Sequence, residues 1–439
     1  MINSFGDIFK VQDLKRKIGF TFLILAVYRV GTTVPLPGVN AAALQAFFAS
    51  QQGGVLGFLN MFSGGAMARL SIFALGIMPY INASIIMSLL QTAIPYLEKL
   101  SKEGAPGREK ITRMTRYATL LIGSVQAFGL TFWIQSMKTP GGESVLMFTG
   151  FGFRLLLVLT MLTGTMLVMW LGEQITESGI GNGISLIIFT GIVAGFPSGL
   201  KNTYSLLTTD EISLFGLALI GAFMLAILAL TVFIEEAQRR IPIQYAQRVV
   251  GRKVYGGQST YLPLKVESSG VIAVIFAMAF MSFPLMIGQF FPDSALFEKI
   301  QIFFSPGNAV YIIVYTVLIV AFCYFYTLLT FDPKNIADNL KKSGGFIPGV
   351  RPGEQTSEKI KTVMYRIILI GAIFVVFIAI VPMILKNFHM PFYFGGTALL
   401  IIVGVALDTM GQVESQLIMR HYDGLLKKSR LKGRYFNIK

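Results

Sequence analysis

The residues of this chain whose types could support catalysis or metal binding are few and widely spaced. The sequence of 439 residues contains two histidines, His389 and His421, and one cysteine, Cys323. Neither histidine has a cluster of His, Cys, Asp or Glu around it at the spacing of a metal site. A single cysteine allows no internal disulfide. The sequence therefore predicts no catalytic centre, no metal site and no cofactor, and we do not expect an enzyme.

The glycine-rich motif at residues 179–183 is the segment that most resembles a phosphate-binding loop. No strand is predicted before it, and its glycines are not spaced as in the dinucleotide fingerprint. The chain also lacks the Gly-Lys-Ser or Gly-Lys-Thr of a P-loop. If the protein depends on nucleotide hydrolysis, we expect a partner to supply it.

The chain contains ten apolar stretches, and the elements they form determine where the remaining residues lie. Hydrophobic residues make up 54% of the chain and charged residues only 13%, whereas a soluble domain has about 25% charged residues. A hydrocarbon core about 30 Å thick requires roughly 20 apolar helical residues, so each stretch can cross a membrane once. The first stretch begins at Ile18 and continues past Arg29 to the break at Pro35. The other nine contain no Asp, Glu, Lys or Arg and cover residues 70–97, 117–137, 155–172, 178–200, 212–234, 268–292, 300–331, 367–385 and 387–407.

Most basic residues fall on one side of the layout that these ten spans produce. Thirty of the 37 lysines and arginines lie in the termini and loops of that side. The five in the loops of the other side are Arg69, Lys138, Lys201, Lys299 and Lys386. Because loops rich in Lys and Arg stay in the cytoplasm, the pattern predicts a multi-pass protein of the cell inner membrane with both termini cytoplasmic. Basic loops of this kind also contact anionic lipids.

Charged residues within the spans are equally scarce. The candidates are Arg29, Glu173, Glu267 and Asp408, and all four fall near span ends, where a side chain can reach the interface. Ion-coupled carriers usually place charged groups near the middle of the bilayer. A secondary transporter with ten spans in two halves is the alternative interpretation, and this scarcity of charge argues against it. Pro79, with Gly76 beside it, predicts a bent helix in the second span.

Three of the segments between the spans contain patterns that predict a local structure. On the outer side, residues 55–62 are apolar but too short to cross a membrane, and a Ser-Gly-Gly break follows. On the cytoplasmic side, β-prone residues flank a glycine turn with Arg252 and Lys253, which predicts a hairpin with a cationic tip over 235–268. In the later cytoplasmic segment, 331–361, glycine and proline surround Arg351, which predicts a tight, exposed turn.

Seven motifs spread along the chain form a recognisable set. They occupy residues 61–81, 172–185, 239–242, 258–260, 337–344, 351–354 and 391–397. Together they closely resemble the bacterial SecY family, the pore subunits of the protein-conducting channel (translocon). The resemblance covers about residues 14 to 434, with the motifs in the order that the family has them.

The resemblance implies an all-α polytopic membrane protein with ten transmembrane helices in two inverted five-helix halves around an hourglass pore. The halves would comprise residues 1–200 and 201–439, with a hinge near 197–211. The family's activity implies a channel that translocates unfolded preproteins across the cytoplasmic membrane and releases hydrophobic segments laterally into it. An apolar pore ring would consist of Ile77, Ile81, Ile188, Ile275, Ala279 and Ile401. We expect Leu400, next to this ring, to face lipid.

A short re-entrant plug helix over about residues 55–66 would close the outer vestibule. Its residues would be Val55, Leu56, Phe58, Leu59, Asn60, Met61, Phe62, Ser63, Gly64 and Gly65. The pore would open sideways between spans 2–3 and spans 7–8, at a lateral gate where Asn82, Gln126 and Glu267 are expected to make polar contacts with one another. The family commonly has proline in the seventh span where this chain has Ala273, so a straighter helix is expected there.

The resemblance also implies partners. The motor ATPase SecA and the ribosome would dock on cytoplasmic loops, and cationic side chains suit ribosomal RNA phosphates. The docking residues would be Arg239, Arg240, Arg252, Lys253 and Arg351. The small membrane subunits SecE and SecG, signal peptides, preproteins and anionic lipids complete the expected partners.

Overall fold

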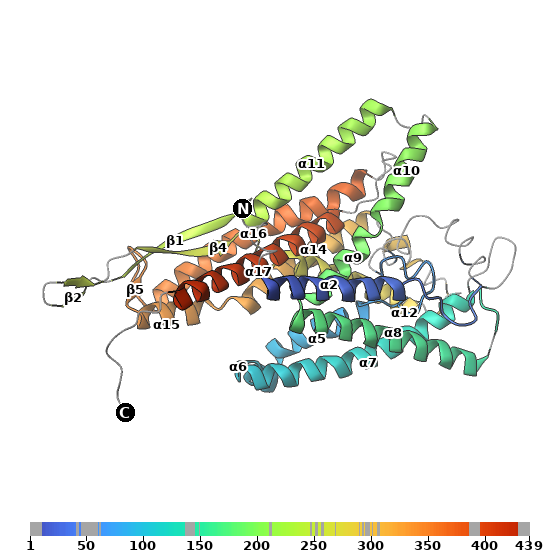
Figure 1. The fold of residues 1–439 in the computed structure, drawn as a ribbon, viewed down its shortest axis with the longest axis horizontal. Coiled ribbons are helices and arrows are strands. Elements are labelled where there is room, and N and C mark those ends of the chain that lie inside the picture. The colour runs from blue at the N-terminus through green and yellow to red at the C-terminus, as the bar shows by residue number, and fades with distance from the viewer. Residues whose placement is uncertain are drawn as a thin grey trace.

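The structure is a computed structural model of the chain, and it is mainly helical. Figure 1 shows long helices lying side by side, with a slender β structure projecting from one end. The residues that the structure describes are 11–40, 44, 60, 63–136, 145–148, 150–209, 213–245, 248–250, 253–255, 259–267, 269–288, 290–291, 294, 299–300, 302–304, 308–385 and 396–428.

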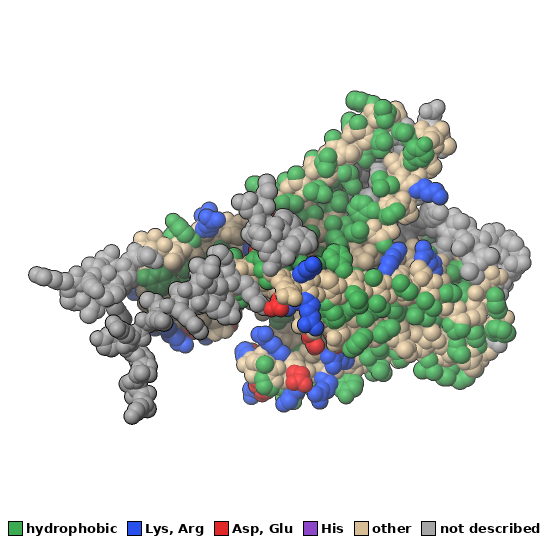
Figure 2. Space-filling model, in the orientation of Figure 1, with side chains coloured by type: hydrophobic (Ala, Val, Ile, Leu, Met, Phe, Trp, Pro, Cys, Tyr) green, Lys and Arg blue, Asp and Glu red, His purple; other side chains and the backbone are tan. Residues whose placement is uncertain are grey.

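Where the structure describes them, the predicted apolar stretches are mainly helical. In the described part of the chain, 8 helical segments are long and apolar enough to cross a membrane. Hydrophobic side chains cover most of the helical body in Figure 2, whereas charged side chains gather around α6 and the neighbouring helix ends. The helices are α2 (Gln12–Gly31), α5 (Met78–Ala93), α6 (Pro95–Lys102), α7 (Ala105–Ser136), α8 (Phe151–Ser178), α9 (Gly183–Val193), α10 (Phe196–Thr208), α11 (Leu214–Glu236), α12 (Gly270–Gly288), α14 (Ala309–Thr330), α15 (Pro333–Lys342), α16 (Glu354–Leu385) and α17 (Gly396–Lys428).

The second span differs from its prediction. Residues 63–77 form successive turns, and α5 begins only at Met78. Pro79 lies in the first turn of α5, where its missing N–H would have no helical partner in any case. Gly76 has a φ of +55° and stands before the helix. The bent helix predicted at Pro79 is therefore wrong, since this proline starts a helix and does not kink one.

Two further spans, those predicted over 178–200 and 268–292, are not uninterrupted regular helices. The stretch predicted over 178–200 is divided into α9 and α10, and α10 covers much of the predicted hinge region. The seventh span, α12, lacks a proline at Ala273 but contains Pro284 in its interior. The helix continues through Ala273, and its straighter course at that position stays a prediction, whereas Pro284 removes a backbone hydrogen bond further on.

The hairpin predicted over 235–268 is confirmed, and its cytoplasmic location stays a prediction. β1 (Gln238–Tyr245) pairs antiparallel with β4 (Thr260–Lys265), and β2 (Arg248–Val250) pairs with β3 (Lys253–Tyr255) towards the tip. The short β5 (Gly345–Phe346) adds to β1, so the sheet order is β4-β1-β5. The two loop segments that looked separate in the sequence, 235–268 and 331–361, thus contribute strands to one sheet.

One large apolar cluster occupies the centre of the bundle. It receives buried side chains from α2, α5, α8, α9, α11, α12, α14, α16 and α17. A second cluster joins α7 and α8 to residues 36, 44, 67–74 and 145–146. The central cluster is where the residues predicted for the pore ring lie.

Candidate functional site

The six residues predicted for the pore ring come from four helices and are all buried in the central cluster. Each is at most 7% exposed. Ile77 caps α5 and Ile81 lies one turn further on, while Ile275 and Ala279 are one turn apart on α12. Residues four apart lie on one face of a helix. Ile188 of α9 and Ile401 of α17 belong to the same cluster. Their role as a constriction remains a prediction.

The position next to Ile401 was misjudged. Leu400 is only 3% exposed and belongs to the central cluster. The expectation that it faces lipid is therefore wrong. Helix α17 contacts α9, α11, α12 and α16, so more than one of its faces is covered.

The predicted plug lies mostly outside the described residues. Val55, Leu56, Phe58, Leu59, Met61 and Phe62 are among those that the structure does not describe. Asn60, Ser63, Gly64 and Gly65 are described. The Asn60 side chain accepts a 2.8 Å hydrogen bond from the Ala68 N–H, and Ser63 Oγ accepts one of 3.1 Å from the Met67 N–H.

Arg29 holds this segment from α2. Its Nη1 donates a 2.5 Å hydrogen bond to the Gly64 carbonyl, and the Tyr28 hydroxyl donates one of 3.4 Å to the Ser63 carbonyl. Gly64 has a φ of +64°, and a Cβ there would lie 3.0 Å from Gly191 Cα of α9. The segment is thus seated between α2 and α9. Sequence reasoning interpreted Arg29 as reaching the interface, but its partner is a buried backbone.

The polar residues predicted at the lateral gate are all buried, but they do not bond with one another. Neither polar atom of the Asn82 side chain has a hydrogen-bond partner in the described part of the chain. Gln126 Nε2 donates to Met286 Sδ at 3.6 Å, and its Oε1 has no partner there either. Glu267 accepts a 2.5 Å hydrogen bond from Ser269 Oγ. The predicted contact among the three is therefore wrong for this structure; their place at a gate remains a prediction.

We call the contact of α12 with α5 and α7 the front seam. Ser282 of α12 also donates to Met286 Sδ, at 3.7 Å, so the thioether accepts from both sides of the seam. A small cavity of about 50 Å³ lies here, and its lining includes Gln126, Ser282, Met286 and Ser63. Sulfur is a weak acceptor. The front seam is therefore closed mainly by apolar and weakly polar side chains.

The glycine-rich motif forms a second contact between the early and late helices, which we call the rear junction (residues 176–183 with Thr21 and Gln412). The Ile180 N–H donates to Thr21 Oγ1 of α2 at 3.1 Å, and the Gly181 N–H donates to Gln412 Oε1 of α17 at 3.0 Å. The Gly183 N–H donates to Thr176 Oγ1 at 2.9 Å. These side chains satisfy the backbone donors of the turn between α8 and α9.

The glycines of the rear junction are required by close packing. A Cβ on Gly183 would lie 1.9 Å from the Gly172 carbonyl oxygen, and one on Gly179 would lie 2.5 Å from Thr21 Oγ1. Gly181 has a φ of +88°, which other residues rarely adopt. The motif therefore serves helix packing. The participation of Thr21, Thr176 and Gln412 was missed, because no local pattern marks residues that meet only in three dimensions.

The residues predicted for docking are exposed where the structure describes their side chains. Arg239 and Arg240 lie on β1. Lys253 lies in β3, and Arg252 falls outside the described residues. Arg351 is exposed between Gly349, with φ of +80°, and Gly353, with φ of +111°. The tight, exposed turn predicted around Arg351 is therefore confirmed, and its role in docking remains a prediction.

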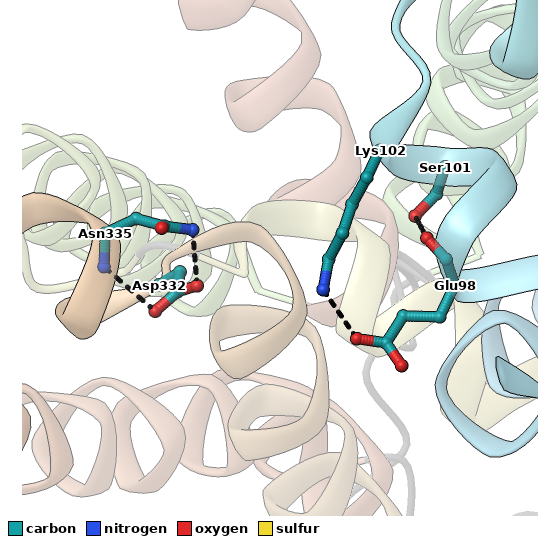
Figure 3. A network of polar contacts seen from close by, with 5 residues as sticks. All are labelled: Glu98, Ser101, Lys102, Asp332 and Asn335. Carbon is teal, nitrogen blue, oxygen red and sulfur yellow. Dashed lines mark hydrogen bonds and ion pairs between the residues drawn. The ribbon is translucent and has the colours of Figure 1, made fainter.

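The C-terminal end of α6 and the N-terminal end of α15 face each other (Figure 3). Lys102 Nζ lies 2.6 Å from Glu98 Oε1, and this hydrogen bond and charge lower the pKa of Glu98. Asp332 caps α15 by accepting from the Lys334 N–H at 2.9 Å and the Asn335 N–H at 3.3 Å, and it also accepts from the Asn335 side chain at 2.6 Å. The charge of Asp332 also acts on Lys102. The early and late helices thus approach each other through opposite charges at this end.

Known proteins resemble this chain in both sequence and fold. A family model described as SecY matches residues 71–410. The protein translocase subunit SecY of Escherichia coli strain K12 is 45% identical over 425 residues, which are 96% of each chain. A solved protein-conducting channel gives a TM-score of 0.64 at 19% identity, with 95% of this chain and 94% of that one covered.

The same fold recurs in Sec61 of the canine ribosome–channel complex, with a TM-score of 0.63 at 18% identity and the same coverage. The all-α polytopic fold that the sequence predicted is therefore confirmed. The extent and identity of the sequence match, together with the fold, show that this multi-pass membrane protein belongs to the SecY family.

Proposed function

We propose that this chain conducts unfolded preproteins through the centre of its helical bundle and releases hydrophobic segments sideways into lipid. A protein-conducting channel is the function that its relatives support. The observation that carries the route is the single buried cluster of Ile77, Ile81, Ile188, Ile275 and Ile401 together with Ala279. It lies where four helices meet, and it offers only apolar groups.

An apolar ring suits a pore that must pass every sequence. It recognises no particular side chain, and it excludes water and ions by dewetting when no polypeptide is present. A polar segment gains nothing by leaving the aqueous path, whereas a segment rich in leucine gains a few tenths of a kcal/mol per residue on entering lipid. Sorting between export and insertion then follows from transfer free energies, and the chain itself need not catalyse a reaction.

The contacts of residues 63–65 favour the assignment of this segment to a plug on the outer side. Arg29 and Tyr28 hold its backbone, and the small cavity of the front seam lies beside it. In this proposal the two halves, 1–200 and 201–439, separate at the front seam. The protein lies in the cell inner membrane with both termini in the cytoplasm.

The cytoplasmic surface supports docking of a motor and of the ribosome. Arg239 and Arg240 are exposed on β1, and Arg351 is exposed in the turn that follows β5; the sheet β4-β1-β5 joins the two loops. Such cations suit acidic protein surfaces and RNA phosphates. We assign them to SecA and the ribosome, the partners that the family resemblance implies.

A groove of about 380 Å³ between α2, α17 and residues 180–189 is lined almost entirely by apolar side chains. It contains Phe22, Leu25, Phe189, Val405 and Leu417 among others. A single apolar helix would fit such a surface, and we assign it to one of the small membrane subunits, SecE or SecG.

The ring is tested by Ile401→Asn. A buried amide in an apolar constriction should hold water, so we expect a larger ion conductance of the resting channel and export of precursors with defective signal sequences. The effect should be largest when residues 55–66 are also deleted. Single-channel recording in planar bilayers measures it.

The matched control is Ile373→Asn, because Ile373 of α16 is 59% exposed. It should impair insertion or folding without opening a conductance. A double variant, Ile401→Asn without residues 55–66, that stays as tight as the parent would contradict the ring and favour a carrier with an occluded site.

Docking is tested by Arg351→Glu. Charge reversal replaces attraction by repulsion at an interface, so motor-driven export should be lost while the protein remains folded and inserted. Lys359→Glu is the control, since Lys359 is exposed nearby on α16. Near-normal export by Arg351→Glu in reconstituted vesicles would remove Arg351 from the docking site.

A further inference from the structure

The outer part of the front seam is closed by an aromatic ring packed onto a glycine. Gly129 of α7 is buried, and a Cβ there would lie 2.8 and 3.0 Å from ring carbons of Phe290. Phe290 follows the end of α12, where its N–H donates to the Ile287 carbonyl at 3.2 Å. The absence of a side chain at Gly129 thus lets a residue beside α12 reach the backbone of α7.

Two aromatic rings of α7 flank this position. Phe128 and Phe132 lie with their ring centroids 6.5 and 6.3 Å from that of Phe290, at interplanar angles of 43° and 44°. They also pack edge to face with each other at 5.2 Å. These separations fall within the range of favourable aromatic pairs. We call Phe128, Gly129, Phe132 and Phe290 the aromatic clasp.

On the α7 side of the clasp, Phe132 also contacts a side chain of α8. The guanidinium of Arg154, at the start of α8, lies 4.6 Å from the ring centroid of Phe132 and donates to the Gln135 side chain. A cation over an aromatic face is an attractive contact. Phe132 is therefore fixed to α7 and α8, whereas Phe290 stands at the end of α12, on the other side of the seam.

We propose that the aromatic clasp sets how hydrophobic a segment must be to leave the channel for lipid. The proposal rests on the proposed function, since it assigns a specificity-determining residue, Phe290, to the lateral opening. Opening the seam separates Phe290 from Phe128, Gly129 and Phe132. A passing segment must recover that loss through its own transfer into lipid, so a stronger clasp demands a more hydrophobic segment.

The test uses reconstituted vesicles and a series of segments with graded numbers of leucine and alanine. For a segment near the threshold, Phe290→Ala should raise the ratio of inserted to exported product by about tenfold, the factor expected from losing two aromatic pairs. Phe290→Leu should have a smaller effect. Phe291→Ala is the matched control, because Phe291 is the next residue but is 65% exposed; it should leave the threshold unchanged.

A second variant separates the clasp from general damage to the helix. Gly129→Ala should displace the Phe290 ring and lower the threshold in the same direction. Combined with Phe290→Ala, it should add little, because the clash has already been removed. Full additivity of the two changes, or a Phe290→Ala threshold equal to that of Phe291→Ala, would overturn the clasp.

Export of a soluble precursor by the parent protein distinguishes this outcome from failure of the proposed function. If the parent exports and inserts normally while the clasp variants behave like the control, only the clasp is wrong. If the parent neither exports nor inserts, both the proposed function and the clasp are overturned.

Discussion

The front seam and the rear junction both join early helices to late ones, but the front seam consists of side-chain contacts and the rear junction mainly of backbone contacts. At the front, α12 meets α7 through a thioether, a weakly bonded amide and aromatic rings. At the rear, α17 meets the turn between α8 and α9 through a backbone N–H, and glycines bring backbone onto backbone.

This difference suggests which contact opens. Apolar side chains of the front seam can exchange one apolar neighbour for another, including a lipid chain or a passing segment, so part of the contact energy lost on opening is recovered. A backbone N–H inside the bundle has no such substitute, and leaving it unpaired is costly. We therefore expect the front seam to open and the rear junction to act as the pivot.

The largest effect is expected from Gly183→Ala in the rear junction. The new methyl group would overlap the Gly172 carbonyl oxygen, 1.9 Å from the Cβ position, and backbone on both sides leaves no flexible group to yield. Overpacking of this kind destabilises by roughly 1–3 kcal/mol or more. The yield of monodisperse protein and its thermal midpoint in detergent should both fall.

Gly221→Ala is the control for that change. Apart from the neighbouring backbone of α11 itself, no atom lies within 4 Å of a Cβ at Gly221, so the substitution should be neutral or slightly stabilising through helix propensity. Equal stability of the two variants would show that the rear junction is not rigid, and the comparison of the two contacts would fail.

Arg29→Met tests the segment that lies against α2 and α9. The variant keeps an unbranched apolar stem but loses the guanidinium and its charged hydrogen bond to the Gly64 carbonyl, a contribution of about 1.5–3 kcal/mol. We expect a larger resting ion leak with an unchanged insertion threshold, since the front seam is not touched. Arg69→Gln, at an exposed arginine, is the control; an equal leak in both would remove Arg29 from this role.

In the front seam, Asn82→Leu combined with Gln126→Leu should act in the opposite direction to a loosened clasp. Both side chains have buried polar atoms without a partner in the described structure, and such atoms destabilise by about 1–3 kcal/mol each. Replacing them should favour the closed seam and raise the number of leucines that a segment needs for insertion. Ser124→Leu, at a more accessible position of α7, should leave the threshold in place; a threshold that does not rise in the double variant would contradict the assignment.

The sequence was most informative where the signal is periodic or local. The ten apolar stretches predicted the helical fold, and β-prone residues around a glycine turn predicted the hairpin of β1 to β4. The turn around Arg351 followed from Gly349 and Gly353. In each case neighbouring residues determine the structure, so one sequence suffices.

The failures share a physical cause as well. Leu400 was expected to face lipid, and Asn82, Gln126 and Glu267 were expected to bond, because spacing along one helix says nothing about which neighbour covers each face. Arg29 pairs with the backbone carbonyl of Gly64, and because every residue has such a carbonyl, the sequence does not identify this partner. Pro79 misled because a proline marks either a kink or a helix start, and only the preceding turns decide which.

The smallest effect is expected from Gln412→Leu in the rear junction. The substitution removes the acceptor of the Gly181 N–H and should destabilise by about 0.5–1.5 kcal/mol, as neutral hydrogen bonds do. Gln412→Glu retains an oxygen at the same reach and should restore most of the loss. We expect a slightly lower thermal midpoint for Gln412→Leu and an insertion threshold equal to that of the parent, because a pivot that loosens need not change what the front seam admits. If Gln412→Leu shifts the threshold as far as the Asn82 and Gln126 double variant while leaving the thermal midpoint unchanged, the rear junction is itself a gate, and the division into an opening seam and a pivot is wrong.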